Sequence, residues 1–180
     1  VYLDNLRTAK QTITYIFGDE RDVEFQPHFT YQGFRYVWIR EWPEESVGEN
    51  ALTAIGLCSQ MEQTLQFHCS EPLVNRLVEN IRWGMRSNFV DIPTDCPQRD
   101  ERLGWTGDAQ IFGRTAAYLM QTELFFRKWL TDVAADQTPE GGVPHVIPDI
   151  VSGKCADNWL LSQGEHSAAA WADAIVILPW

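Results

Sequence analysis

The spacing of apolar residues changes near Ser70, and this change restricts the fold more than any other feature of the chain. Before Ser70, short runs of alternating apolar and polar residues are separated by segments rich in turn-forming residues. These runs cover residues 12–17, 34–40, 52–58 and 65–69. Because successive side chains of a strand point to opposite faces, alternation is typical of strands with one buried face. Residues 1–70 are therefore expected to form strands of an antiparallel sandwich.

A helical pattern begins directly after this point. Ser70 can cap a helix, and Pro72 suits its first turn because that position needs no backbone N–H donor. Apolar residues then recur at helical spacing, at Leu73, Leu77 and Ile81. The replacement of one pattern by the other predicts a domain boundary near residue 70.

The second domain, residues 71–180, is expected to be mainly helical. Further helices are predicted at residues 108–120, 123–135 and about 167–178, the first of them with Asp108 at its N-cap. The apolar stripe of the second consists of Phe126, Trp129, Leu130 and Val133. The third is apolar on nearly every face, so we expect helices beyond this chain to cover it.

The chain is acidic, with a formal charge of -11 over 180 residues and a sequence pI near 4.7. Since it has no run of Lys or Arg, nucleic acid and anionic membranes are not expected as partners. No stretch approaches the roughly 20 apolar residues that span a bilayer. The first residues lack the features of a signal peptide, which favours a cytoplasmic over a secreted location. Both ends nevertheless look cut, because the chain starts without Met and ends on apolar residues.

Neither the cysteines nor the histidines indicate a metal or cofactor site, and we expect neither. The four cysteines contain no CxxC pair and are expected to be free, mostly buried thiols. They are Cys58, Cys69, Cys96 and Cys155. The four histidines are scattered without a ligand spacing such as HExxH. They are His28, His68, His145 and His166.

Chemically active side chains concentrate in residues 91–108, between the first two predicted helices. This segment holds four aspartates, one glutamate, two arginines, two prolines and two glycines, which predicts a long structured loop. Glycoside hydrolysis needs a protonated carboxylic acid, a second carboxylate opposite it, and polar groups that hold the sugar hydroxyls. The loop offers the first and the third, with Glu101 as the candidate acid.

The same residues also fit a purely structural role. Asp95 can start a turn, and Asp108 can cap a helix. Arg99 can form a surface ion pair with Asp100. Trp105 fits a core as well as a platform for the apolar face of a sugar ring. The residues by themselves leave both interpretations open.

The segment PTDCPQRDERLGWTGDAQ, residues 93–110, resembles the signature of the bacterial α-L-rhamnosidases. Four more segments are similar to the same family, in the same order. They are PHFTYQGFRY (27–36), FHCSEPLVNRLVENIRWGMRSNF (67–89), KWLTDVAADQTPEGGVPHVIPD (128–149) and AAWADAIVILPW (169–180). The resemblance therefore extends over nearly the whole chain.

This resemblance implies a multidomain protein with both α and β structure. The chain would be the end of an antiparallel β-sandwich followed by the first helices of an (α/α)6 barrel, cut before the barrel is complete. The implied reaction is inverting hydrolysis of terminal α-L-rhamnosyl residues, without a cofactor. The expected partner is a rhamnose-containing glycoside or oligosaccharide, and a homodimer of the parent enzyme stays an open expectation.

The resemblance also assigns roles to single residues. Glu101 matches the general acid of the family. The matches to positions that hold the rhamnose are Asp95, Arg99, Trp105 and Asp108, and Trp171 is expected as a further wall of the pocket. The family's general base is a glutamate on a later helix, and no residue of this chain matches it. The fragment is therefore expected to be inactive by itself.

Two other functions stay open. The first is another (α/α)6 carbohydrate hydrolase or phosphorylase. The second is a noncatalytic sugar-binding protein with the same aromatic and carboxylate pocket. An acidic residue facing Glu101 in the complete protein would distinguish an enzyme from a binding protein.

Overall fold

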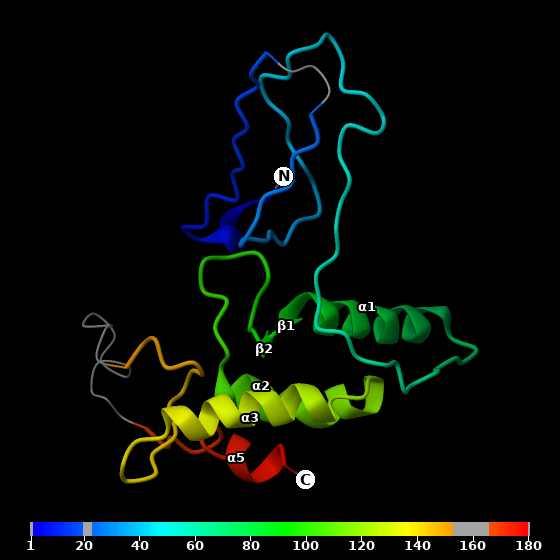
Figure 1. The fold of residues 1–180 in the computed structure, drawn as a ribbon. Helices are drawn as coiled ribbons and strands as arrows, with labels where there is room; N and C mark the ends of the chain where they lie inside the picture. Colours follow the sequence, from blue (N-terminus) through cyan, green and yellow to red (C-terminus); the bar gives the residue numbers. More distant parts are fainter. Residues whose placement is uncertain (1, 20–22, 153–165, 180) are drawn as a thin grey trace.

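The computed structural model describes residues 2–19, 23–152 and 166–179. They form an N-terminal lobe of irregular chain, residues 2–19 and 23–58, and a helical part that follows it (Figure 1). The elements in chain order are η1 (Asp4–Leu6), α1 (Pro72–Asn88), β1 (Phe89–Val90), β2 (Ile92–Pro93), α2 (Thr106–Leu119), α3 (Glu123–Asp136) and α5 (Ala174–Ile177). The short strands β1 and β2 pair antiparallel directly after α1. Among these elements, none is a helix long and apolar enough to cross a membrane.

The described part of residues 1–70 contains none of the expected strands. In the described part of this region the regular structure is η1 and one isolated bridge, between Gln63 and Met120. A strand needs a partner segment along its length, and an alternating pattern supplies no partner by itself. Side chains expected to face a sandwich core stay in solvent, with Ile16 86% and Trp38 78% exposed. The described residues therefore do not confirm the predicted sandwich, which stays a prediction.

Three of the four predicted helices are confirmed, two of them with changes at their first turns. The N-cap of α1 is Glu71 and not Ser70, and a Glu71 carboxylate oxygen accepts from the Leu73 N–H at 3.2 Å. Helix α2 begins at Thr106, so that Asp108 lies inside its first turn instead of capping it. The cause is Trp105, whose extended backbone takes the N-cap position.

The predicted helix at residues 167–178 is wrong over most of its length. Only α5, a single turn, is helical there. Ser167 and Ala170 have φ values of 65° and 71°, which a right-handed helix does not admit. The turn α5 packs against α2, a contact that the apolar pattern did not predict, and the pattern was a poor guide to the backbone.

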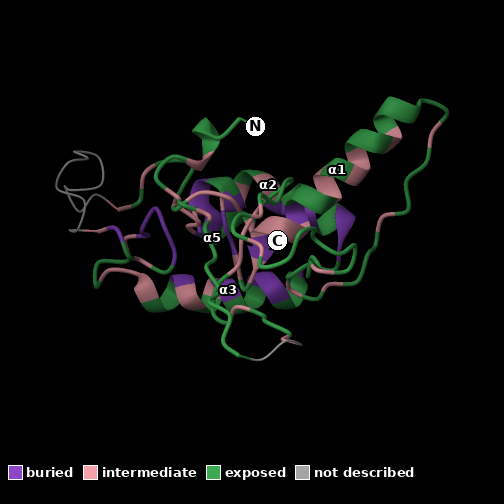
Figure 2. Cartoon of the chain, turned by 90° about the horizontal axis from the view of Figure 1, so that it is seen from above, coloured by how far each residue is buried: buried purple, intermediate pink, exposed green. Residues whose placement is uncertain are grey.

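The core lies where the end of α1, α2 and α3 meet, as the buried residues in Figure 2 show. The ring of Phe89 stacks on that of Phe125 at 4.5 Å between centroids, with 7° between the planes. Phe112 and Phe126 pack edge-on against Phe89. Trp129 is fully buried on the predicted stripe of α3. This aromatic cluster holds together the two ends of the segment that carries the candidate site.

The cysteines are less buried than the sequence suggested. Cys96 is buried, Cys69 is half-buried and Cys58 is exposed, and all three are free. Burial and the neighbouring Asp95 raise the pKa of the Cys96 thiol, so it stays protonated and unreactive. Cys155 lies outside the described residues.

Candidate active site

The loop between β2 and α2 is held in place by the segment that follows α3. The Thr106 N–H and hydroxyl both donate to the His145 carbonyl, at 2.9 and 3.0 Å. The Ile147 N–H donates to the Gly104 carbonyl at 2.9 Å. A side chain at Gly104 would collide with the Ile147 carbonyl, so this close approach requires glycine. The end of the loop therefore has a defined position relative to the core.

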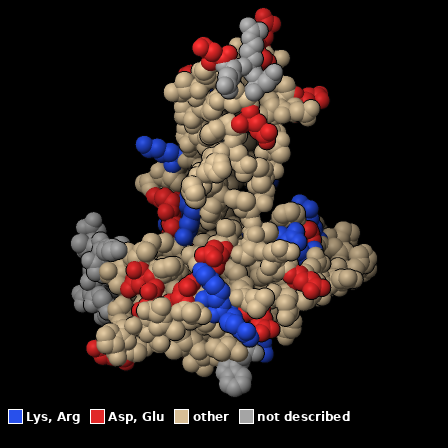
Figure 3. All heavy atoms as spheres, viewed as in Figure 1, with Lys and Arg blue, Asp and Glu red and all other residues tan. Residues whose placement is uncertain are grey.

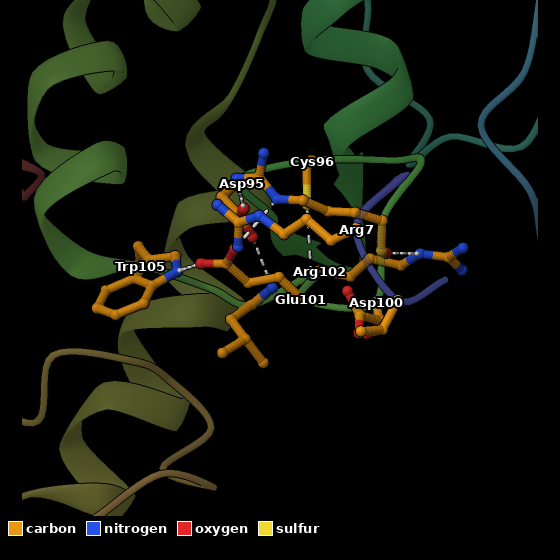
Figure 4. Close-up of polar contacts among 10 residues, drawn as sticks. Arg7, Asp95, Cys96, Asp100, Glu101, Arg102 and Trp105 are labelled. Carbon is orange, nitrogen blue, oxygen red and sulfur yellow. Dashed lines mark hydrogen bonds and ion pairs between the residues drawn. The ribbon is translucent and has the colours of Figure 1, made fainter. Parts of the chain in front are cut away.

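Glu101 lies at the centre of the polar contacts of this loop (Figure 4). Its Oε1 accepts from the Trp105 indole N–H at 2.9 Å. Its Oε2 accepts from Arg99 Nε at 3.1 Å. The side chain keeps 20% of its surface exposed, so the carboxyl group is not sealed from solvent.

Arg99 joins the two carboxylates of the loop. Its Nη2 donates to Asp95 Oδ2 at 2.9 Å while its Nε contacts Glu101. The other oxygen of Asp95 accepts from the Leu103 N–H at 2.8 Å. Asp95 is only 5% exposed, and these two bonds compensate for its buried charge. Although burial acts against its charge, the neighbouring carboxylates of Asp95 and Glu101 raise the pKa of Arg99, so it stays a cation.

Asp108 behaves differently from the other carboxylates. Burial raises the pKa of its carboxyl group, and the negative charges of Asp95 and Glu101 add to this rise, while Arg99 partly opposes it. An aspartic acid that keeps its proton more readily can donate as well as accept a hydrogen bond. Such a group suits the recognition of a sugar hydroxyl.

Two adjacent clefts share the side chains of Asp108 and Phe112. One, of about 460 Å³, has Trp171 and Ile111 on its walls. The other, of about 340 Å³, has Asp95 on its wall. Trp171 packs closely on Gly107, where an added Cβ would lie 3.0 Å from the indole ring. A surface with carboxylates on one side and apolar or aromatic groups on the other fits a sugar ring.

The six predicted site residues thus occupy one region, but in two groups. Asp95, Asp108 and Trp171 line the clefts. The other three predicted residues, Arg99, Glu101 and Trp105, lie on the loop and are not part of either cleft wall.

One contact at the site could not be found from the sequence. Arg7, at the end of η1, places Nη1 2.6 Å from Glu101 Oε2. The two residues are 94 positions apart in the sequence, and no sequence motif links them. In Figure 3, acidic and basic side chains lie side by side where the upper lobe meets the helical part. Among the described residues, no group of three or more His, Cys, Asp or Glu side chains could hold a metal ion.

Family models match nearly the whole chain. Residues 1–58 match the bacterial alpha-L-rhamnosidase concanavalin-like domain. Residues 62–180 match the bacterial alpha-L-rhamnosidase 6 hairpin glycosidase domain. The second match includes the loop, both clefts and every predicted site residue.

Known proteins with the same description are similar over the full chain. An alpha-L-rhamnosidase of Formosa agariphila is 39% identical over 99% of this chain, and one of Streptomyces avermitilis is 38% identical over 100%. The chain spans 18% and 16% of the lengths of these two relatives.

Solved structures agree with the sequence comparisons. The crystal structure of the Streptomyces avermitilis alpha-L-rhamnosidase complexed with L-rhamnose matches 68% of this chain and 11% of its own, with a TM-score of 0.60 and 40% identity. The crystal structure of the native rhamnosidase from Aspergillus terreus matches 68% of this chain and 13% of its own, with a TM-score of 0.59 and 48% identity.

Proposed function

The chain belongs to the bacterial α-L-rhamnosidase family, and from this premise we propose that the protein that carries it hydrolyses terminal, non-reducing α-L-rhamnose residues of rhamnosides. The observation that carries the proposal is the setting of Glu101, a partly exposed carboxyl group held by Trp105 and Arg99. Arg99 also binds Asp95, which lines one of the two sugar-sized clefts. The rhamnoside substrate is proposed on the names of the relatives.

In the proposed reaction, Glu101 protonates the glycosidic oxygen as the bond to the leaving group breaks. A second carboxylate then removes a proton from a water molecule on the opposite face of the sugar, which inverts the anomeric centre. We place this base outside the 180 residues, since no residue of the chain matches the base of the family. By the same reasoning the isolated chain does not turn over substrate.

The remaining site residues hold the sugar. Asp95 lines one cleft, and its carboxylate is already oriented by its bond to Arg99 of the loop. Asp108, with its raised pKa, binds a hydroxyl near the anomeric carbon. Trp105 and Trp171 supply flat apolar surfaces. Ile111 offers an apolar contact for the methyl group of a 6-deoxy sugar.

The proposal extends to the architecture. The matches to residues 1–58 and 62–180 support a concanavalin-like domain followed by a six-hairpin glycosidase domain. We propose that the first is a β-sandwich, that the second is part of an (α/α)6 barrel, and that the two can be separated near residue 70, just before α1. Limited proteolysis of the longer protein would test this division. Cleavage near residue 70 that releases a stable helical domain is expected, whereas cleavage between α2 and α3 would contradict it.

The decisive experiment compares two variants of the longer protein on two rhamnosides. Glu101→Gln keeps the shape of the side chain but removes its proton, so kcat/KM should fall about 10²–10⁴-fold on a poor leaving group. An activated aryl rhamnoside scarcely needs protonation and should be affected much less. Asp108→Asn should reduce both rates, because it acts on the sugar itself.

Two outcomes would contradict the proposed function. Equal losses on both substrates in Glu101→Gln would reject Glu101 as the proton donor. Binding of L-rhamnose by the wild-type protein without hydrolysis of any rhamnoside would favour a sugar-binding protein instead.

A further inference from the structure

The loop that carries Glu101 is joined to the N-terminal lobe at its outer edge. Arg7 forms its ion pair with Glu101, Thr8 donates from its hydroxyl to the Asp100 carboxylate, and Gln11 donates to the Gln98 carbonyl. Three contacts from residues 7–11 therefore tie one short stretch of the lobe to the loop around Glu101.

A second stretch of the lobe contacts the same loop from Tyr31 to Gly33. Arg102 Nη1 donates to the Tyr31 carbonyl at 2.7 Å, and the guanidinium lies 4.8 Å from the centre of the Tyr31 ring. At Gly33 an added Cβ would lie 2.6 Å from the carbonyl carbon of Pro97. The lobe thus approaches the loop so closely that only glycine fits at this position.

Arg102 occupies an unusual backbone conformation within the loop. Its φ of 48° lies in the left-handed region, which residues other than glycine seldom adopt. Its Nε donates to the Arg99 carbonyl at 2.9 Å, and its N–H points to Cys96 Sγ at 3.4 Å. These bonds hold the turn that directs the preceding residue, Glu101, towards Trp105.

We propose that Arg102 is a positioning residue, which clamps the acid loop onto Tyr31 of the N-terminal lobe and thereby sets the direction of the Glu101 carboxyl group. The consequence for catalysis rests on the function proposed above. The lobe contributes no residue to either cleft, so its effect on the reaction would pass through this clamp.

The test uses the longer protein that contains this chain. Arg102→Met removes the donors and the charge but keeps an apolar stem, and Arg102→Lys keeps the charge without the planar fork. Arg102→Gly accepts the positive φ without strain and so separates the backbone from the side chain. Arg40→Met is the matched control, because Arg40 also lies over an aromatic ring, 4.0 Å from the centre of Trp38, but that ring belongs to the lobe and not to a contact with the loop.

Two measurements are made on each variant. The first is amide hydrogen exchange in residues 97–105, with exchange in α3 as a measure of intact folding. The second is kcat and KM on a rhamnoside with a poor leaving group and on an activated one. Arg102→Met and Arg102→Gly should speed exchange in residues 97–105 but not in α3. They should lower kcat on the poor leaving group by up to about 100-fold, with KM unchanged. Arg102→Lys should fall between these variants and the wild type, and Arg40→Met should match the wild type.

Several outcomes would overturn the inference. Unchanged exchange in residues 97–105 of Arg102→Met would show that no clamp exists. Wild-type kcat in Arg102→Gly, or a loss confined to KM, would show that the side chain does not position Glu101. If the wild-type protein hydrolyses no rhamnoside but Arg102→Met still loosens the loop, the clamp is supported and the proposed function is what fails.

Discussion

The helical part and the N-terminal lobe use their apolar side chains in opposite ways. Helices α1 to α3 surround a core in which Trp129 and Ala116 have no exposed surface. In the lobe, Ile16 and Trp38 lie mostly in solvent. The lobe is joined to the site by polar contacts, such as those of Arg7 and Arg102, rather than by a shared core.

The difference follows from where backbone hydrogen bonds are made. A helix satisfies its N–H and C=O groups within one segment, so three helices need only side-chain contacts to form a core. A strand must find its partner elsewhere in the chain, and the lobe contains no paired strands among its described residues. Stability should therefore be concentrated in the helical part, while the lobe should act mainly on the geometry of the loop.

The largest expected difference in stability is between the replacements of two tryptophans by alanine. Trp129→Ala should destabilise the chain by about 3–5 kcal/mol, because it leaves a cavity in the core and removes the indole N–H that points to the Ile147 carbonyl. Trp38→Ala removes an exposed ring and its contact with Arg40, and should cost under about 1 kcal/mol. Denaturant unfolding followed by the helical circular dichroism signal measures both. Equal losses would mean that the lobe is packed as tightly as the helices, which would break the comparison.

A smaller difference in stability is expected between the removal of two threonine hydroxyls. Thr106 is fully buried, and replacing it by the similarly shaped valine should cost about 1 kcal/mol through the lost bond to the His145 carbonyl. Thr64, in the N-terminal part, is exposed and donates to the Tyr118 carbonyl at 2.9 Å. Thr64→Val should cost less, since water can replace that bond. The same unfolding measurement applies, and a larger loss in Thr64→Val would show that burial does not decide the contribution of these two hydrogen bonds.

A gain in stability is expected at Gly84, inside α1. No atom lies within 4 Å of the position of an added Cβ, so Gly84→Ala should stabilise the chain by about 0.5–1 kcal/mol through helix propensity alone. Gly107→Ala in α2 is the matched control, because its Cβ would press on the Trp171 indole and offset the same gain. Thermal unfolding of both variants checks this. A loss of stability in Gly84→Ala would show that α1 packs against something at this position.

The smallest effect concerns pH. Because the pKa of Asp108 is raised on folding, its ionisation is easier in the unfolded chain, whose ordinary value is 3.8. The wild type should therefore lose stability as the pH rises from this value through the folded pKa of Asp108. Asp108→Asn cannot ionise and should gain on the wild type over the same range, with the two converging in acid. Unfolding midpoints at several pH values measure the difference, and a constant offset at all pH values would contradict it.

The local pattern of the chain was sufficient for α1, α2 and α3. Their apolar spacing repeats within a few residues, and the buried Phe126, Trp129 and Val133 of α3 follow it. The loop motif likewise identified Asp95, Arg99, Glu101 and Trp105 as neighbours, because they lie within eleven consecutive residues, 95–105. The strands were not predictable in the same way, since alternation describes one strand and says nothing about its partner.

The sequence by itself thus determined the helices and the chemical content of the loop, both of which depend on residues close together along the chain. Only the tertiary structure decided which distant groups surround them. It brought Arg7 and Tyr31 to the loop, Trp171 onto Gly107, and Asp95 and Glu101 close enough to Asp108 to raise its pKa. Electrostatic and hydrogen-bonding energies depend on distance in space, and the folding of the chain sets those distances independently of separation in sequence.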